Sequence, residues 1–206
     1  GMPYLDAIAA VVVAAMVGKV GWALGVQALR ELVDTALDAE RVAAIRDTIL
    51  AVDGVKDLHL LKTRRMGSDA LVDVHILLQD PELSVSEGHQ ISETVRARVI
   101  REVDEVAEVM VHIDPEDDEQ VAPGRHLPLR REMLARLREL WAGIPAAGRI
   151  RRVDLHYLDG RVQVEVFLPL DALPSGEDAR AAQKQALIRA VASDPRVGDV
   201  RVHYTD

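Results

Sequence analysis

The pattern of hydrophobic and polar positions separates an apolar opening segment from a longer, mixed remainder. Residues 7–29 carry a single charge, at Lys19, and are numerous enough to cross a bilayer as one helix. They lack the basic start and the cleavage pattern of a signal peptide. Their many Ala and Gly residues also fit a buried helix in a soluble protein, so the segment alone leaves both interpretations open.

After this segment the pattern predicts a helix, two strands, a helix and a strand. Apolar residues at helical spacing predict a helix over 40–52, which ends at Asp53-Gly54. A turn is expected over 64–69. Alternation and β-branched residues predict strands over 55–63, 70–78 and 107–113. A helix from about 86 to 104 is expected between the second and the third of these strands.

The rest of the chain repeats this order. One helix is expected over 129–141, and another follows the segment 174–177 and ends at Ala192. Strands are expected over 149–157, 161–168 and 197–204, with a tight hairpin turn at Asp159-Gly160. Short matches support an internal repeat: Asp57-Leu58-His59-Leu60-Leu61 with Asp154-Leu155-His156-Tyr157-Leu158, and Val111-His112-Ile113 with Val202-His203-Tyr204.

The α-β-β-α-β order predicts an α+β fold with two tandem ferredoxin-like domains, preceded by the apolar, transmembrane-type helix. The expected divisions are the helix with its charged exit, the first repeat, a linker rich in acids, Pro and Gly, and the second repeat. Their boundaries are 1–38, 39–117, 118–127 and 128–206.

Composition narrows the chemistry. The chain has no cysteine, so a transition-metal site must use imidazole and carboxylate ligands. The net charge of −9 argues against nucleic-acid binding. Residues 1–123 hold 11 Lys/Arg and 23 Asp/Glu (net −12), whereas residues 124–206 hold 14 and 11 (net +3), so the acidic part could attract cations.

Four of the seven histidines fall in the first repeat, one on each of four predicted elements. His59, His75 and His112 lie on strands, and His89 lies in the first turn of a helix. Asp114 follows His112 by two residues and so shares its strand face. Together they offer enough ligands for one tetrahedral zinc ion, and for a second with a bridging carboxylate. Without a compact motif, solvated histidines with no shared role remain the alternative.

Ordered segments of the first repeat resemble the cytoplasmic domain of cation diffusion facilitators, a family of divalent-metal exporters. The run over 54–67 is similar to the family block GV-x-x-x-H-x-L-R-T-R-x-x-G. Residues 72–76 resemble the family's second strand, and residues 83–89 resemble its L-S-V-x-x-A/G-H helix start. Residues 111–115 resemble its closing V-H-x-[ED]-P. Gly21-Trp22 and the run 31–34 are similar to the end of the last membrane helix. The resemblance covers roughly residues 5–117.

The resemblance implies a ferredoxin-like domain that dimerises and regulates export of Zn²⁺, or of Co²⁺, Mn²⁺, Fe²⁺ or Cd²⁺. It implies metal binding at His59, His75, His89, His112 and Asp114, and a charge interlock between cytoplasmic and membrane parts at Asp34. The remaining membrane helices of the same transporter would be partners. The chain would sit in the cell (inner) membrane, with its C-terminal domains cytoplasmic.

The second repeat carries a weaker echo of the cluster. The local matches align His156 with His59 and His203 with His112. The same alignment places Glu165 opposite His75, Asp178 opposite His89 and Thr205 opposite Asp114. This predicts either a weak second metal site formed by His156, Glu165, Asp178 and His203, or a domain that kept its fold and lost its site.

Three functions compete at this point. The leading one is a regulatory metal-sensing domain of an exporter, which is not an enzyme. The second is a structural dimerisation module with incidental histidines. The third, a metal-dependent hydrolase, is the weakest, because the sequence offers no evident general base or nucleophile beside the cluster.

Overall fold

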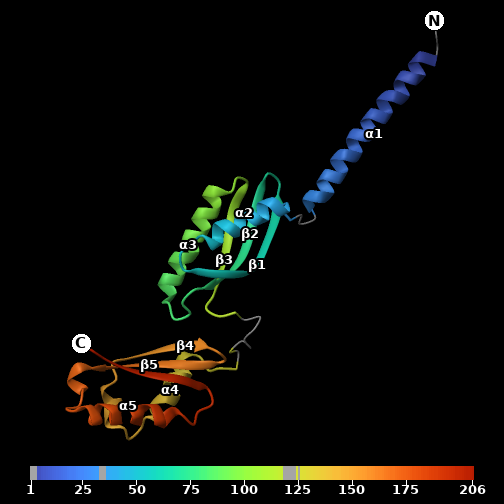
Figure 1. Cartoon of the computed structure of the whole chain (residues 1–206). Coiled ribbons are helices and arrows are strands. Elements are labelled where there is room, and N and C mark those ends of the chain that lie inside the picture. Colours follow the sequence, from blue (N-terminus) through green and yellow to red (C-terminus); the bar gives the residue numbers. More distant parts are fainter. Residues whose placement is uncertain (1–3, 33–35, 118–123, 125) are drawn as a thin grey trace. The chain divides into compact units, whose positions relative to one another are not determined.

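The computed structural model describes residues 4–32, 36–117, 124 and 126–206 (Figure 1). Two compact units divide the chain, one comprising residues 1–79 and 83–114 and the other residues 80–82 and 115–206. Each holds one three-stranded sheet. The prediction of an α+β fold with two repeated ferredoxin-like domains is confirmed. Most of the predicted linker over 118–127 lies outside the described residues, and Asp34 lies outside them as well.

Helix α1 (Tyr4–Leu32) contains the apolar segment. Residues 7–26 have a mean hydropathy of 2.0, and none of that segment is buried. By length and composition it could cross a membrane. A helix in a soluble core would bury most of its apolar side chains, and α1 leaves large ones exposed, among them Val11, Val17 and Trp22.

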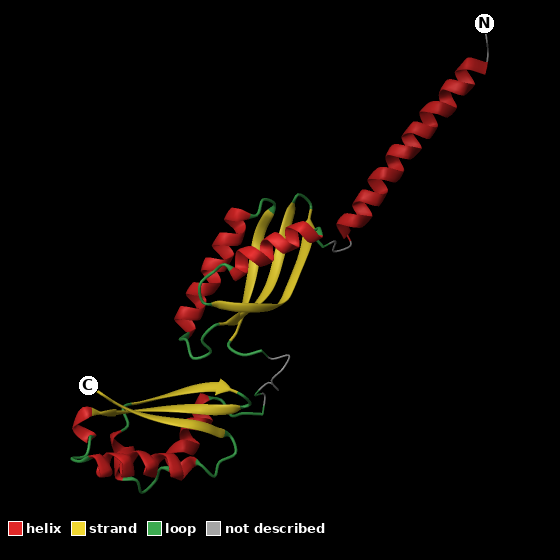
Figure 2. Ribbon diagram, in the orientation of Figure 1, coloured by secondary structure: helices red, strands yellow, loops and turns green. Residues whose placement is uncertain are grey.

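The first unit contains α2 (Ala39–Leu50), β1 (Val55–Met66), β2 (Asp69–Leu78), α3 (Val85–Glu102) and β3 (Val106–Asp114). The sheet order is β1-β2-β3, with β1 antiparallel and β3 parallel to the central β2. Both helices cover the same face of the sheet (Figure 2). The other sheet face is therefore free of helices within this unit.

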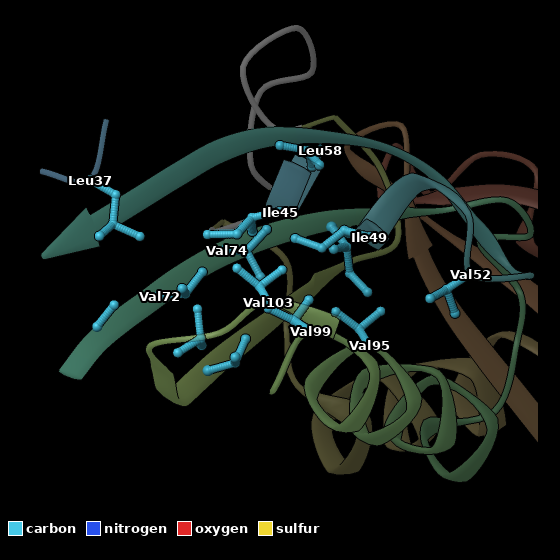
Figure 3. Close-up of a cluster of buried hydrophobic side chains, with 14 of the residues drawn as sticks. Leu37, Ile45, Ile49, Val52, Leu58, Val72, Val74, Val95, Val99 and Val103 are labelled. Atoms are coloured by element: carbon cyan, nitrogen blue, oxygen red, sulfur yellow. The ribbon is translucent and has the colours of Figure 1, made fainter. Parts of the chain in front are cut away.

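The core lies between that sheet face and the two helices (Figure 3). Alternate residues of β2 point into it, because successive side chains of a strand face opposite sides. Ile45 and Ile49 of α2 and Val95 and Val99 of α3 complete it, all with no exposed surface. The other set of β2 residues, which includes His75, consequently faces away from the helices.

Local interactions account for the element ends. The Asp38 side chain caps α2 by accepting from the Arg41 backbone N–H at 3.0 Å, and Ser84 with Glu87 forms a capping box at α3. The turn predicted over 64–69 is too long. β1 continues to Met66, which pairs with Asp69, so only two residues form the turn.

The second unit repeats the architecture with α4 (Arg130–Leu140), β4 (Arg152–Leu158), β5 (Arg161–Pro169), α5 (Glu177–Val191) and β6 (Val197–Thr205). Its sheet order is β4-β5-β6, again antiparallel then parallel. Asp159 and Gly160, with φ of 54° and 67°, form the predicted hairpin turn. The strand expected from residue 149 begins later, because the 3-10 helix η1 (Pro145–Arg149) precedes it; a second such helix is η2 (Leu170–Ala172).

Candidate metal centre

Asp114, the last residue of β3, is the hub of the histidine cluster. The carboxylate is buried, with a residue exposure of 7%. Its Oδ2 atom lies 3.1 Å from His59 Nε2 and 3.3 Å from His75 Nδ1, while Oδ1 lies 3.0 Å from His112 Nε2. Three imidazoles from three strands thus surround one carboxylate, and the contact of His112 with Asp114 is the one that their shared strand face predicts.

The two oxygens of Asp114 face different ligands. One ligand atom each from His59, His75 and Asp114 lie within 4.8 Å of one another. Two ligands about 2.1 Å from a tetrahedral zinc ion stand about 3.4 Å apart, which matches the spacing around Oδ2. That oxygen is buried and accepts no hydrogen bond within the described part of the chain. The arrangement could hold one ion beside Oδ2 and a second beside Oδ1 and His112.

A β-bulge in β1 brings His59 to the cluster. Leu58 pairs with Ile76 and Leu60 pairs with His75, so His59 is an extra residue with no partner position on β2. Leu58 is buried in the core, and the bulge lets both His59 and Leu60 lie on the sheet face away from the helices. The histidine therefore meets Asp114 from a strand that does not neighbour β3.

Strand register fixes the other pair. His75 and His112 are direct partners in the parallel pairing of β2 and β3, and their ring centroids lie 4.5 Å apart. His75 also packs edge-on against His59, with centroids 5.6 Å apart. A groove of about 440 Å³ adjoins His75 and His112. A small cation can therefore reach these imidazoles from solvent.

His89 is not brought into the cluster. It lies in the second turn of α3, not the first, and it is exposed. Its backbone carbonyl accepts a hydrogen bond from Ser92 Oγ at 2.8 Å, and its side chain makes no hydrogen bond or ion pair within the described part of the chain. Within this chain its side chain belongs to the helical layer, whereas Asp114 and its three histidines lie on strands.

The second unit does not align as the short sequence matches predict. His203 pairs with Phe167 across β5 and β6, as His112 pairs with His75 across β3 and β2. The structural counterpart of His75 is therefore Phe167, not Glu165. β4 has no bulge, and His156 pairs with Gln163, far from the position of His59. Placing Glu165 opposite His75 and His156 opposite His59 is wrong.

Glu165 nevertheless gathers two histidines. His156 Nε2 lies 3.7 Å and His203 Nε2 3.3 Å from its carboxylate oxygens. Arg201 Nε lies 3.2 Å from the same carboxylate, so a cation already occupies its surroundings. The sequence contained this signal, because Arg201 precedes His203 by two residues and shares its strand face. Asp178 is exposed in the first turn of α5, away from Glu165 on β5.

Comparison with known families and proteins gives an independent view of the first unit. Residues 37–116 match the family model described as the cation efflux protein, cytoplasmic domain. The whole chain is 30% identical over 216 aligned residues to Metal tolerance protein C1 of Arabidopsis thaliana, covering 46% of that protein. A stretch of 113 residues, 55% of the chain, is 46% identical to Metal tolerance protein 2 of Oryza sativa and covers 29% of it.

The Manganese efflux system protein MneP of Bacillus subtilis is 30% identical over 112 residues, which cover 54% of this chain and 37% of MneP. The chain thus spans less than half the length of each of these relatives. Among solved structures, MamM-CTD aligns with 37% of this chain and 98% of its own length, at 29% identity and a TM-score of 0.35.

Proposed function

Because residues 37–116 match the family model of the cation efflux protein, cytoplasmic domain, we propose that this chain belongs to that family and is the regulatory portion of a divalent-cation exporter. In this proposal the first unit binds a metal ion on the cytoplasmic side of the cell membrane. Binding changes how two copies of the chain associate, and that change sets the activity of the membrane part. The single observation that carries the proposal is the convergence of three imidazoles on the buried carboxylate of Asp114.

The charge balance supports a cation at this position. A buried carboxylate is unfavourable unless it is paired or hydrogen-bonded. Imidazoles that bind a metal ion do so through a neutral nitrogen lone pair, so a divalent ion between them would supply the charge that neutralises the carboxylate. We assign His59, His75 and Asp114 to the first ion, with His112 on the other carboxylate oxygen. The donor set suits Zn²⁺ and equally Co²⁺, Mn²⁺, Fe²⁺ or Cd²⁺.

The regulatory step follows from where the ligands lie. They come from three strands on the helix-free sheet face, so an ion would tie β1 to β3 across β2 and stiffen that face. If two copies associate more tightly when this face is stiffened, the metal favours the dimer. The reason is that a ligand shifts an equilibrium toward the state that binds it more tightly. Homodimerisation on metal binding is part of the proposal.

The membrane part of the proposal rests on α1. Its apolar segment is long enough to span the hydrocarbon layer. We place it as the last membrane helix of the exporter, beside the other membrane helices of the same protein. The ion pathway itself would lie among those helices. The second unit, in which Arg201 competes with metal for Glu165, would support the dimer or contact a partner rather than sense the metal.

Titration calorimetry with zinc on the full chain in detergent tests the binding step. The wild type should bind zinc saturably, and the His75→Ala/His112→Ala double variant should lose at least tenfold in affinity. Equal zinc affinity of the two proteins would contradict the proposal that these histidines bind the metal. Sedimentation analysis with and without zinc then tests regulation: association that ignores zinc, in a protein that binds it, would favour a structural dimerisation module.

A further inference from the structure

The second unit has a pocket on the side formed by α4 and η1. Its volume is about 520 Å³, a size typical of small-molecule sites. Its lining combines an apolar floor with a ring of cations. The floor includes Leu134, Trp141, Ile144 and Ile150, and the cations are Arg130, Arg138, Arg151 and Arg152.

The charge around the pocket is one-sided. No acidic residue is among the described residues that line it. Two of the arginines are committed elsewhere: Arg130 donates to the Val153 carbonyl at 2.8 Å, and Arg152 pairs with Asp154 at 3.1 Å. Arg138 and Arg151 are exposed and have no ion pair within the described part of the chain. Guanidinium groups bind carboxylates and phosphates through paired hydrogen bonds, so these two are available to an anion.

The pocket floor is rigid and open. The Trp141 ring is fixed because its indole N–H donates to the Leu187 carbonyl at 3.0 Å inside the core. Gly148 also lines the pocket, and a Cβ atom added there would meet nothing within 4 Å. Apolar surface beside unpaired arginines matches a ligand with an apolar body and an anionic head.

We propose that this pocket binds a small organic anion, an aromatic or aliphatic phosphate or carboxylate, with its charge on Arg138 and Arg151 and its body on the partly exposed Leu134, Ile144 and Ile150, above the buried Trp141. The site is separate from the metal centre, lies wholly in the second unit, and does not depend on the proposed transport function. It gives the repeat that lacks the metal cluster a binding role of its own.

Fluorescence of Trp141 in the full chain tests this. The chain has two tryptophans, so a Trp22→Phe background in nonionic detergent with EDTA makes Trp141 the sole reporter. The probe is phenyl phosphate, with inorganic phosphate and benzyl alcohol as partial probes. We expect saturable binding of phenyl phosphate, weakened about tenfold or more in Arg138→Gln/Arg151→Gln, because each charge-assisted hydrogen bond contributes that much.

Two further variants separate the pocket from general charge and from misfolding. Gly148→Leu keeps every arginine and fills the opening, so it should also weaken binding about tenfold. Arg131→Gln removes an exposed arginine of the same helix that does not line the pocket and should change affinity less than twofold. The proposal fails if phenyl phosphate does not saturate, if neither pocket variant weakens it, or if inorganic phosphate or benzyl alcohol binds equally well.

Discussion

His203 stacks on Phe167, with ring centroids 5.0 Å apart and planes 20° apart, at the position where the first unit pairs His112 with His75. Phe167, whose ring cannot bind a metal ion, thus stands where the first unit has the proposed ligand His75. Thr205 in turn stands where Asp114 does, as the last residue of the third strand. The second unit keeps the frame of the site but only one of these three ligands.

This relationship predicts how a site could be restored. A Phe167→His/Thr205→Asp double variant should bind about one additional equivalent of zinc, more weakly than the first unit does, because it recovers two histidines and a carboxylate in matching register. Calorimetric stoichiometry measures this. Phe167→Ala/Thr205→Ala, which changes the same two positions without adding a ligand, is the matched control and should add none.

His75 and His89 should differ in zinc affinity. His75→Ala removes a ligand atom 3.3 Å from Asp114 and should cost at least tenfold. His89→Ala removes an exposed imidazole outside the cluster and should change affinity less than twofold. Calorimetry on both variants checks this, and an equal loss would mean that His89 joins the site when metal binds.

Gly54 and Gly67 form a matched pair for stability. Both have positive φ, 91° and 66°, but a Cβ at Gly54 would lie 2.6 Å from Ile91 Cδ1, whereas one at Gly67 meets nothing within 4 Å. Gly67→Ala should cost about 1 kcal/mol from backbone strain alone. Gly54→Ala should cost about 1 kcal/mol more, because the Ile91 side chain must leave its packed position to admit the methyl group. Urea unfolding of the first unit measures both, and equal losses would contradict this.

Asp194 should control the acid stability of the second unit. Its buried carboxylate accepts hydrogen bonds from Arg196 at 2.8 Å and 2.7 Å and from Arg136 at 3.1 Å, which hold the pKa of Asp194 well below its usual range. A depressed folded-state pKa adds stability above the unfolded value of about 3.9, and that stability is lost as pH falls toward the folded value.

The Asp194→Asn variant should therefore lose about 2 kcal/mol at neutral pH, because the buried side chain loses its charge-assisted hydrogen bonds while the partly exposed Arg136 and Arg196 stay solvated. It should also unfold with less dependence on pH below about 4 than the wild type. Urea unfolding of the second unit at pH 3 to 7 measures this. Parallel pH profiles for the two proteins would contradict the assignment.

Sequence patterns were sufficient for the order of elements and for the proximity of His112 and Asp114. The Asp159-Gly160 turn and the alternation along β2 follow from local rules, and the spacing of His112 and Asp114 places them on one face. The bulge at His59 could not be predicted, because it exists only in the pairing of β1 with β2. Bulges depend on both strands, whereas periodicity is read from one.

The error in the second repeat has a local cause. His59 lies eight positions before Gly67, whereas His156 lies only three positions before Asp159, each of these being the first residue of its hairpin turn. A tight turn fixes the register of the strands it joins, so the two histidines cannot occupy matching positions. Distance from the turn, rather than the shared letters Asp-Leu-His, was the informative signal.

The most direct test of the metal centre is anomalous diffraction from crystals of the full chain soaked in zinc. We predict a peak bonded to Asp114 Oδ2, His59 and His75, about 2.0–2.2 Å from each ligand atom. A second, weaker peak is expected beside Asp114 Oδ1 and His112. Zinc bound only elsewhere, for example at His89 or His126, with the Asp114 cluster unchanged, would contradict the account.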